Sequence, residues 1–261
     1  MRKAGWNPIW KWLAIIAMIF LLAPLAIALL NGPGGSSGLY PSPNAYETIS
    51  NASRSITRLP FDYDTSDDVE MLKEYVESNR EALSEIDKAL TQQSRVPLDY
   101  TVPLDELLNA SGTVRLPMRL LIVQARVAEL EENPGAAADV YAKMSVLSPK
   151  LATGGLLVHV MIASAYETMA LEKLIELTPR LSAVEKKRVL SVLTTNARKP
   201  IDFDLVRERE SDYCKHEHGT VRGSILLWSG SALVDQQVDR AIETDDELLR
   251  LRDEAIDLLG S

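Results

Sequence analysis

An uncharged apolar run near the start of the chain constrains its structure more than any other feature. Residues 13–30 read LAIIAMIFLLAPLAIALL and contain no charged side chain. As a helix, this run would span roughly 27 Å, close to the hydrocarbon thickness of a bilayer. Three basic residues precede it, whereas the next charge after it is Glu47. The positive-inside rule predicts a cytoplasmic tail at residues 1–12, a single transmembrane anchor at residues 13–30 and an extracytoplasmic remainder, periplasmic if the host is bacterial.

A cleaved signal peptide is the alternative interpretation of the same run. Residues 26–28 form an A-x-A pattern, and Pro24 can end the apolar helix just before it. Two leucines continue the run beyond this site, and Trp10 and Trp12 suit the headgroup region in front of a retained anchor. We favour the retained signal-anchor. Both alternatives place the rest of the chain outside the cytoplasm.

The sequence after the run predicts a linker and one folded domain. Residues 31–43 (NGPGGSSGLYPSP) have the composition of a flexible linker, and residues 44–261 are predicted as the domain. Lys and Arg total 28, three of them before the run, so residues 31–261 carry 25 basic and 37 acidic side chains. This balance argues against nucleic acid as a partner, because phosphate backbones are bound mainly by basic surfaces. Cys214 is the only cysteine, which excludes an internal disulfide.

The first part of the domain has the apolar periodicity of helices. Apolar residues recur at three- and four-residue spacings over residues 44–58 and again over residues 66–92, where Asn79 completes a heptad stripe. A dimeric coiled coil would use Asn79 to fix its register. We favour an antiparallel hairpin within one chain, because residues 44–58 offer a matching narrow stripe and three heptads are few for an independent coiled coil.

The same periodicity, together with caps and prolines, predicts an all-α domain to the end of the chain. Residues 91–112 are expected to be mostly irregular, with a short helix near residues 104–110 and a binding role left open. Further on, the sequence predicts helices at residues 117–133, 136–148 (ended by Pro149), 156–177 and 182–196, a loop at residues 224–234 packed onto the bundle, and a last helix at residues 245–259 capped by Thr244.

One hairpin of this series resembles a known repeat. In AAADVYAKMSVLSP, Ala137, Tyr141 and Pro149 stand at the spacing of the small, aromatic and terminal proline residues in the second helix of a tetratricopeptide repeat. Ala125 falls where the first helix of that repeat has a small residue. The resemblance covers one degenerate repeat, about residues 116–149. It implies a helical-hairpin array rather than a regular repeat protein, because a stable solenoid normally needs at least three repeats.

Few residues of the chain have ligand or catalytic chemistry. His159 lies in the apolar segment 156–177, where a hydrogen-bonded core position is favoured over a pocket and a second membrane span is disfavoured. Cys214, His216 and His218 are donors that suit zinc or copper. On a helix, however, positions two apart point about 200° from one another. We therefore assign no metal, cofactor or catalytic residue.

Two function classes follow from these features. The favoured hypothesis is a membrane-anchored extracytoplasmic scaffold, not an enzyme, that binds a protein or peptide, because stacked helical hairpins expose surfaces suited to segments of partner chains. Its predicted partners are the bilayer, through residues 13–30, and a protein or peptide. The alternative is a cryptic metal-dependent enzyme that uses Cys214, His216 and His218. With a short anchor followed by alanine- and leucine-rich helices, the chain also resembles uncharacterised bacterial envelope proteins.

Overall fold

The computed structural model describes residues 40–57, 66–103, 106, 109 and 112–261, with no side-chain description for residues 220–234. Within these ranges the fold is all-α, as predicted, apart from one isolated parallel bridge between Asn44 and Gln93. The helices are α2 (Ala45–Ala52), α3 (Val69–Ser78), α4 (Arg80–Ala89), α6 (Arg115–Leu130), α7 (Pro134–Ala152), α8 (Leu157–Leu177), α9 (Ala183–Thr195), α10 (Phe203–His218) and α11 (Thr220–Gly260), with short 3₁₀ turns at Gly112–Val114 and Thr178–Arg180.

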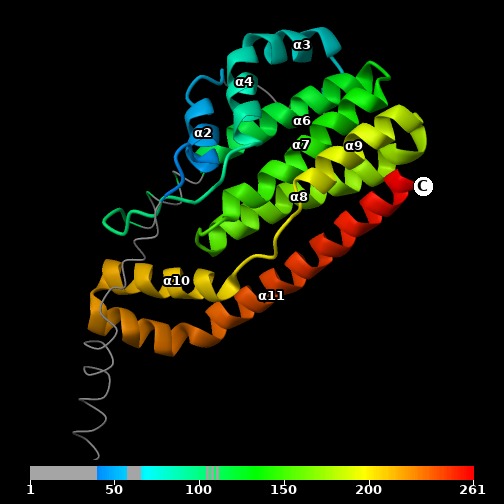
Figure 1. Ribbon diagram of the computed structural model, residues 1–261. Helices are drawn as coiled ribbons and strands as arrows, with labels where there is room; N and C mark the ends of the chain where they lie inside the picture. Colours follow the sequence, from blue (N-terminus) through cyan, green and yellow to red (C-terminus); the bar gives the residue numbers. More distant parts are fainter. Residues whose placement is uncertain (1–39, 58–65, 104–105, 107–108, 110–111) are drawn as a thin grey trace, which may run out of the picture.

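Helix α8 is largely buried and packs mainly against α7 and α11 (Figure 1). Helices α7 and α11 pack along α8, and α9 contacts both of them. Helix α6 forms a hairpin with α7, and α10 forms one with the first part of α11. At the other end of the molecule, α2 packs on α4 and α3 packs on α6. This arrangement buries one large apolar core, with two small separate clusters, one under α3 and one around Leu156 and Tyr213.

The predicted anchor at residues 13–30 and most of the linker lie outside the described residues. Among the helices that are described, none is long and apolar enough to cross a membrane. This finding covers α8, the candidate for a second span, whose boundaries otherwise match the prediction. The short helix expected near residues 104–110 falls largely in undescribed positions.

Asn79 divides the long helix predicted at residues 66–92 into two helices. Its buried side chain accepts a hydrogen bond from the backbone N–H of Thr57 at 2.8 Å and donates one to the carbonyl of Tyr75 at 2.7 Å. These bonds hold the chain at the break, so α3 and α4 point in different directions (Figure 1). The prediction of one continuous helix was wrong. Instead, the part of the heptad stripe on α3 packs against α6, and the part on α4 packs against α2.

Several predicted helix boundaries were also wrong. Helix α2 ends at Ala52, earlier than expected, and α7 begins at Pro134, two residues before the predicted start. Pro149 does not end that helix, which continues to Ala152. A proline lacks its own N–H and obstructs the preceding turn, but its carbonyl still accepts hydrogen bonds, here from the backbone and hydroxyl of Thr153.

The C-terminal part is one long helix where a loop and a shorter helix were expected. Helix α11 includes residues 224–234, and Thr244 lies inside it, where its hydroxyl donates to the carbonyl of Arg240 at 2.9 Å. Thr244 is therefore not an N-cap. The segment read as a loop contains glycine and serine but no proline. A glycine costs a helix only about 1 kcal/mol, which packing can offset.

Candidate functional site

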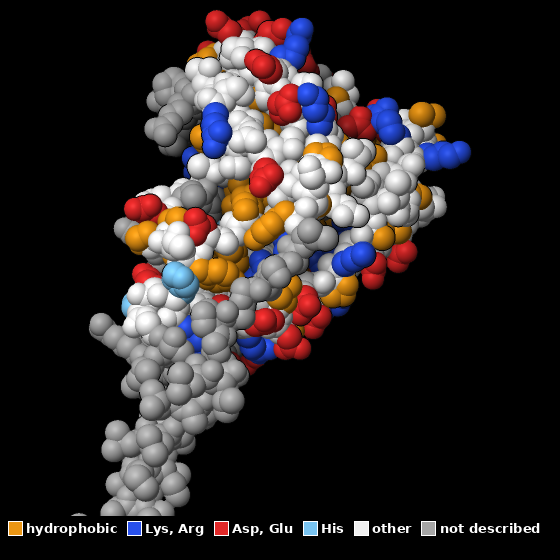
Figure 2. All heavy atoms as spheres, turned by 60° about the vertical axis from the view of Figure 1, so that its left-hand side comes forward, with side chains coloured by type: hydrophobic (Ala, Val, Ile, Leu, Met, Phe, Trp, Pro, Cys, Tyr) orange, Lys and Arg blue, Asp and Glu red, His pale blue; other side chains and the backbone are white. Residues whose placement is uncertain are grey.

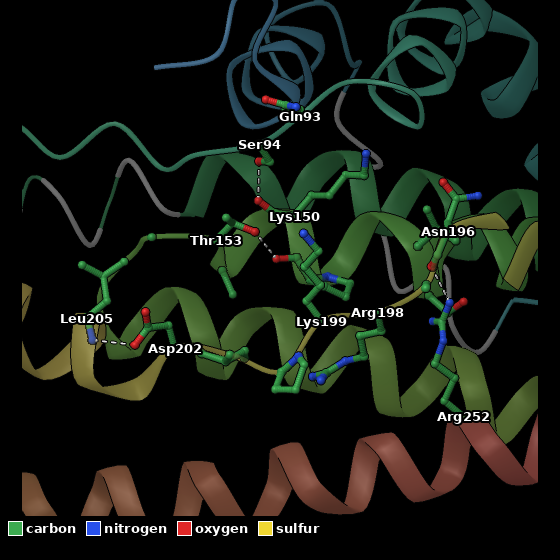
Figure 3. Close-up of a pocket in the computed structure, with 18 of the residues that line it drawn as sticks. Gln93, Ser94, Lys150, Thr153, Asn196, Arg198, Lys199, Asp202, Leu205 and Arg252 are labelled. Atoms are coloured by element: carbon green, nitrogen blue, oxygen red, sulfur yellow. Dashed lines mark hydrogen bonds between the residues drawn. The ribbon is translucent and has the colours of Figure 1, made fainter. Parts of the chain in front are cut away.

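A cleft of about 630 Å³ opens where four segments of the chain meet (Figure 3). The last turns of α7 form one wall, with residues 92–94 beside them. Residues 196–202, which link α9 to α10, form another wall, and Arg252 of α11 also lines the cleft. The side chains around it include four cations, namely Lys150, Arg198, Lys199 and Arg252.

Lys150 fixes the wall formed by α7 and residues 92–94. Its ammonium donates hydrogen bonds to the carbonyls of Ala89, Leu90 and Gln92 at 3.2, 2.8 and 2.6 Å. These carbonyls lie at and just after the C-terminal end of α4, where a positive charge is favourable. In the reverse direction, the hydroxyl of Ser94 donates to the carbonyl of Lys150 at 2.5 Å (Figure 3). Burial lowers the pKa of Lys150, but its bonds to the carbonyls use the charged form.

A buried network of charges holds the opposite wall. Nε of Arg198 lies 2.8 and 2.9 Å from the two carboxylate oxygens of Glu167 in α8, and another nitrogen of its guanidinium bonds Asp245 in α11. The three side chains are 1%, 1% and 4% exposed. Asp245 also accepts a hydrogen bond from the backbone N–H of Ile201 at 3.2 Å. The network thus ties the linker to two helices that are far apart in the sequence.

Arg252 holds the start of the same linker. Its guanidinium donates to the carbonyls of Leu193 and Asn196 at 2.8 and 2.7 Å, at the C-terminal end of α9 (Figure 3). Burial lowers the pKa of Arg252, and the neighbouring charge of Arg198 lowers it further. Burial raises the pKa of Glu167 to about 7, although the guanidinium of Arg198 acts in the opposite direction.

Two features make this cleft suited to binding negatively charged groups. The Nη1 atoms of Arg198 and Arg252 are buried without a hydrogen-bond partner, and Lys199 is exposed with no interaction among the described residues. The lining contains one acid, Asp202, whose carboxylate already caps α10 by accepting from the N–H of Leu205 at 3.0 Å (Figure 3). Glu167 and Asp245 already compensate Arg198, so the positive charges of the lining that have no ion pair among the described residues are those of Lys150, Lys199 and Arg252.

The hydroxyl groups of the cleft are engaged in local structure. Those of Ser94, Ser145 and Thr153 each donate to a backbone carbonyl. A hydroxyl acts as a nucleophile when it faces a general base, whereas these three donate to carbonyls. The cations of the lining can hold a ligand by charge and hydrogen bonds.

The residues singled out from the sequence lie elsewhere. Cys214, His216 and His218 are on α10, and the two histidines are exposed (Figure 2). Burial raises the pKa of the Cys214 thiol, which opposes thiolate formation. Among the described residues, no three histidine, cysteine or acidic side chains are grouped so as to hold a metal ion.

His159 lies in the core, not in the cleft. It is 3% exposed, its Nδ1 accepts a hydrogen bond from the backbone N–H of Leu156 at 3.1 Å, and its ring packs edge-on against Tyr46. Burial lowers its pKa to about 4, so the ring is neutral near pH 7. The favoured prediction of a hydrogen-bonded core histidine is confirmed, and the pocket alternative was wrong.

Sequence reasoning missed the cleft, although one signal for it was present. Glu167 is an acid inside the most apolar helix of the domain, and such a group requires a buried cation as partner. The segment NARKP around Arg198 supplies that cation 31 residues later.

Comparisons with protein-family models, with curated proteins and with solved structures find no match to this chain.

Proposed function

We propose that this chain is a membrane-tethered helical scaffold that binds an extended, acidic segment of a partner protein in the cleft. The observation that carries this proposal is the set of cations around the cleft, two of which have guanidinium nitrogens without partners. Arginine and lysine bind carboxylates by charge-assisted hydrogen bonds. An acidic segment would pair with the exposed ammonium of Lys199 and lie beside the buried guanidinium groups.

The shape of the site favours a chain segment over a compact small molecule. The cleft is open and is lined by residues from α7, the linker 196–202 and the segment 92–94. A segment of extended chain presents side chains alternately and carries its own backbone donors and acceptors.

The packing of α6 on α7 supports the relation to hairpin-repeat proteins. Ala125 and Ala137 are fully buried, and Tyr141 is 4% exposed with its hydroxyl donating to Glu129 at 2.7 Å. Small residues that let two helices approach, followed by a buried aromatic, are the features that the tetratricopeptide pattern requires. The proposed protein is thus an array of helical hairpins that uses the junction between them for binding.

The proposal includes the tether and its orientation. The run at residues 13–30 and the basic tail before it support an anchor with the domain outside the cytoplasm. A reporter that is active only outside the cytoplasm, fused after Ser261, should therefore be active. Activity of a cytoplasm-only reporter at the same position would contradict the orientation.

The binding proposal is tested by capture from native membranes with variants of the full chain. Leu205→Trp places a bulky ring in the cleft, and Lys199→Glu reverses the charge of an exposed cation there. Val184→Trp on α9, where the side chain is 75% exposed, is the matched control. A partner retained by the wild type and the control but lost with both cleft variants is expected. A partner held equally by all four proteins would overturn the proposal.

A further inference from the structure

Arg209 of α10 is a buried cation, and two of its three guanidinium nitrogens have no hydrogen-bond partner among the described residues. It is 2% exposed, and its Nε and Nη1 atoms are covered without any hydrogen bond. Arg198 and Arg252, which are comparably buried, bond carboxylates and carbonyls respectively. A guanidinium removed from water without compensation costs free energy. In native proteins an unsatisfied buried group of this kind calls for an explanation such as a bound ion.

The surroundings of Arg209 supply a second positive charge. Its guanidinium lies against Gly154, where a Cβ atom would stand 3.1 Å from Nη1. The backbone N–H of Val96 donates to the carbonyl of Thr153 at 2.9 Å, which places Arg95 beside the same turn. Burial lowers the pKa of Arg209, and the charge of Arg95 lowers it further.

Among the described residues, no acid forms an ion pair with Arg209 or Arg95, although the charge of Glu208 acts to raise the pKa of Arg209. Glu210 follows Arg209 directly, but its carboxylate accepts a hydrogen bond from the N–H of Leu157 at 2.7 Å, at the start of α8. Glu208 is exposed, and among the described residues no carboxylate forms an ion pair with Arg209. Asp99 is exposed and accepts hydrogen bonds from the N–H and hydroxyl of Thr101.

Aromatic side chains enclose the site on its outer side. The ring of Tyr40 lies under the Arg95 guanidinium at 5.4 Å, and its hydroxyl accepts from the N–H of Leu98 at 3.4 Å. Tyr100 stacks at 6.0 Å from Tyr213, one turn of α10 beyond Arg209. Tyr40 is 45% exposed, so this side faces solvent.

We propose that Arg209 and Arg95 bind an oxyanion, a carboxylate or phosphate group, between the turn at residues 153–155 and the segment 95–100. The planar guanidinium is the side chain best suited to such groups, because its nitrogens form two parallel hydrogen bonds to two oxygens. Gly154 lines the cleft and contacts Arg209, whereas Arg209 does not line the cleft. The oxyanion site therefore lies behind the turn and is separate from the proposed peptide site.

Thermal unfolding of the purified full chain tests the site, with sodium phosphate or sodium acetate replacing sodium chloride at constant ionic strength and pH. A ligand that binds only the folded state raises the unfolding midpoint as its concentration rises. The wild type should show this rise, and Arg209→Met should not. Arg207→Met is the matched control on the same helix, because Arg207 is 37% exposed and faces surface acids.

The two salts and a second variant separate the outcomes. A rise in the unfolding midpoint with phosphate alone identifies a phosphate site, and a rise with acetate alone identifies a carboxylate site. A rise with both salts identifies a site that binds either oxyanion. Arg95→Gln should reduce the rise several-fold, which keeps the test informative if Arg209→Met fails to fold. No rise in the wild type, or an equal rise in Arg209→Met, would overturn the proposal.

Discussion

Replacing Arg198 by methionine should destabilise the domain far more than breaking a surface ion pair. The change keeps most of the side-chain volume but removes the cation between Glu167 and Asp245, whose side chains are 1% and 4% exposed. Asp245 would retain the hydrogen bond from the N–H of Ile201. Glu167 would lose both hydrogen bonds that Arg198 donates to it.

The expected loss is about 3 to 5 kcal/mol in the free energy of unfolding near pH 8, because removing one partner leaves buried charges uncompensated. The loss should shrink at pH 5. Burial raises the pKa of Glu167 to about 7 in the folded protein, and without Arg198 it should rise further. A carboxyl with a raised pKa contributes stability that is present below its unfolded pKa and is lost as the pH rises through the folded value.

Urea unfolding of the wild type and the variant at pH 5 and pH 8 measures this loss. Arg188→Met is the control, because Arg188 binds Asp139 at 2.7 Å at the surface and should contribute less than about 1 kcal/mol. A loss for Arg198→Met that is as small as the control, or one that grows toward pH 5, would refute the reasoning about the buried network.

Three further predictions concern other parts of the fold. Asn79→Ala should cost about 1 to 3 kcal/mol in urea unfolding, because the buried amide is lost and its two backbone partners, at Thr57 and Tyr75, are left without it; a cost below about 0.5 would contradict this. Lys150→Met should cost about 1 to 2 kcal/mol and speed hydrogen exchange after α4, since three carbonyls lose a charged donor; unchanged exchange would count against it. Replacing Cys214, His216 and His218 together should leave the circular dichroism and thermal midpoint nearly unchanged, whereas losing a structural zinc would remove on the order of 10 kcal/mol.

The parts of the fold that follow from local sequence were predictable. The helix predicted to start at Ser182 does so, because Ser182 and Glu185 form a capping box in which each side chain bonds the other's backbone N–H. The position of α8 followed from its continuous apolar content. Such signals act within one or two turns of the chain, so they can be read without knowing the packing.

The rest depends on contacts between distant residues. The break at Asn79 keeps the heptad phase, so periodicity alone does not reveal it, and the break is fixed by the N–H of Thr57, 22 residues away. The cleft likewise requires that Arg198 of the linker meet Glu167 of α8 and Asp245 of α11. Hydrophobic patterning indicates that a helix is buried but not which helix it contacts.

Photocrosslinking in cells of the source organism tests the proposed binding of an acidic partner segment most directly. A photoreactive amino acid in place of Lys199 lies at the edge of the cleft, and the same amino acid in place of Val184 lies on the exposed face of α9. The proposal predicts an adduct from position 199 alone, with the crosslinked partner residue in a stretch rich in Asp and Glu. No adduct from position 199, the same adduct from both positions, or a crosslink within a basic or apolar stretch would contradict it.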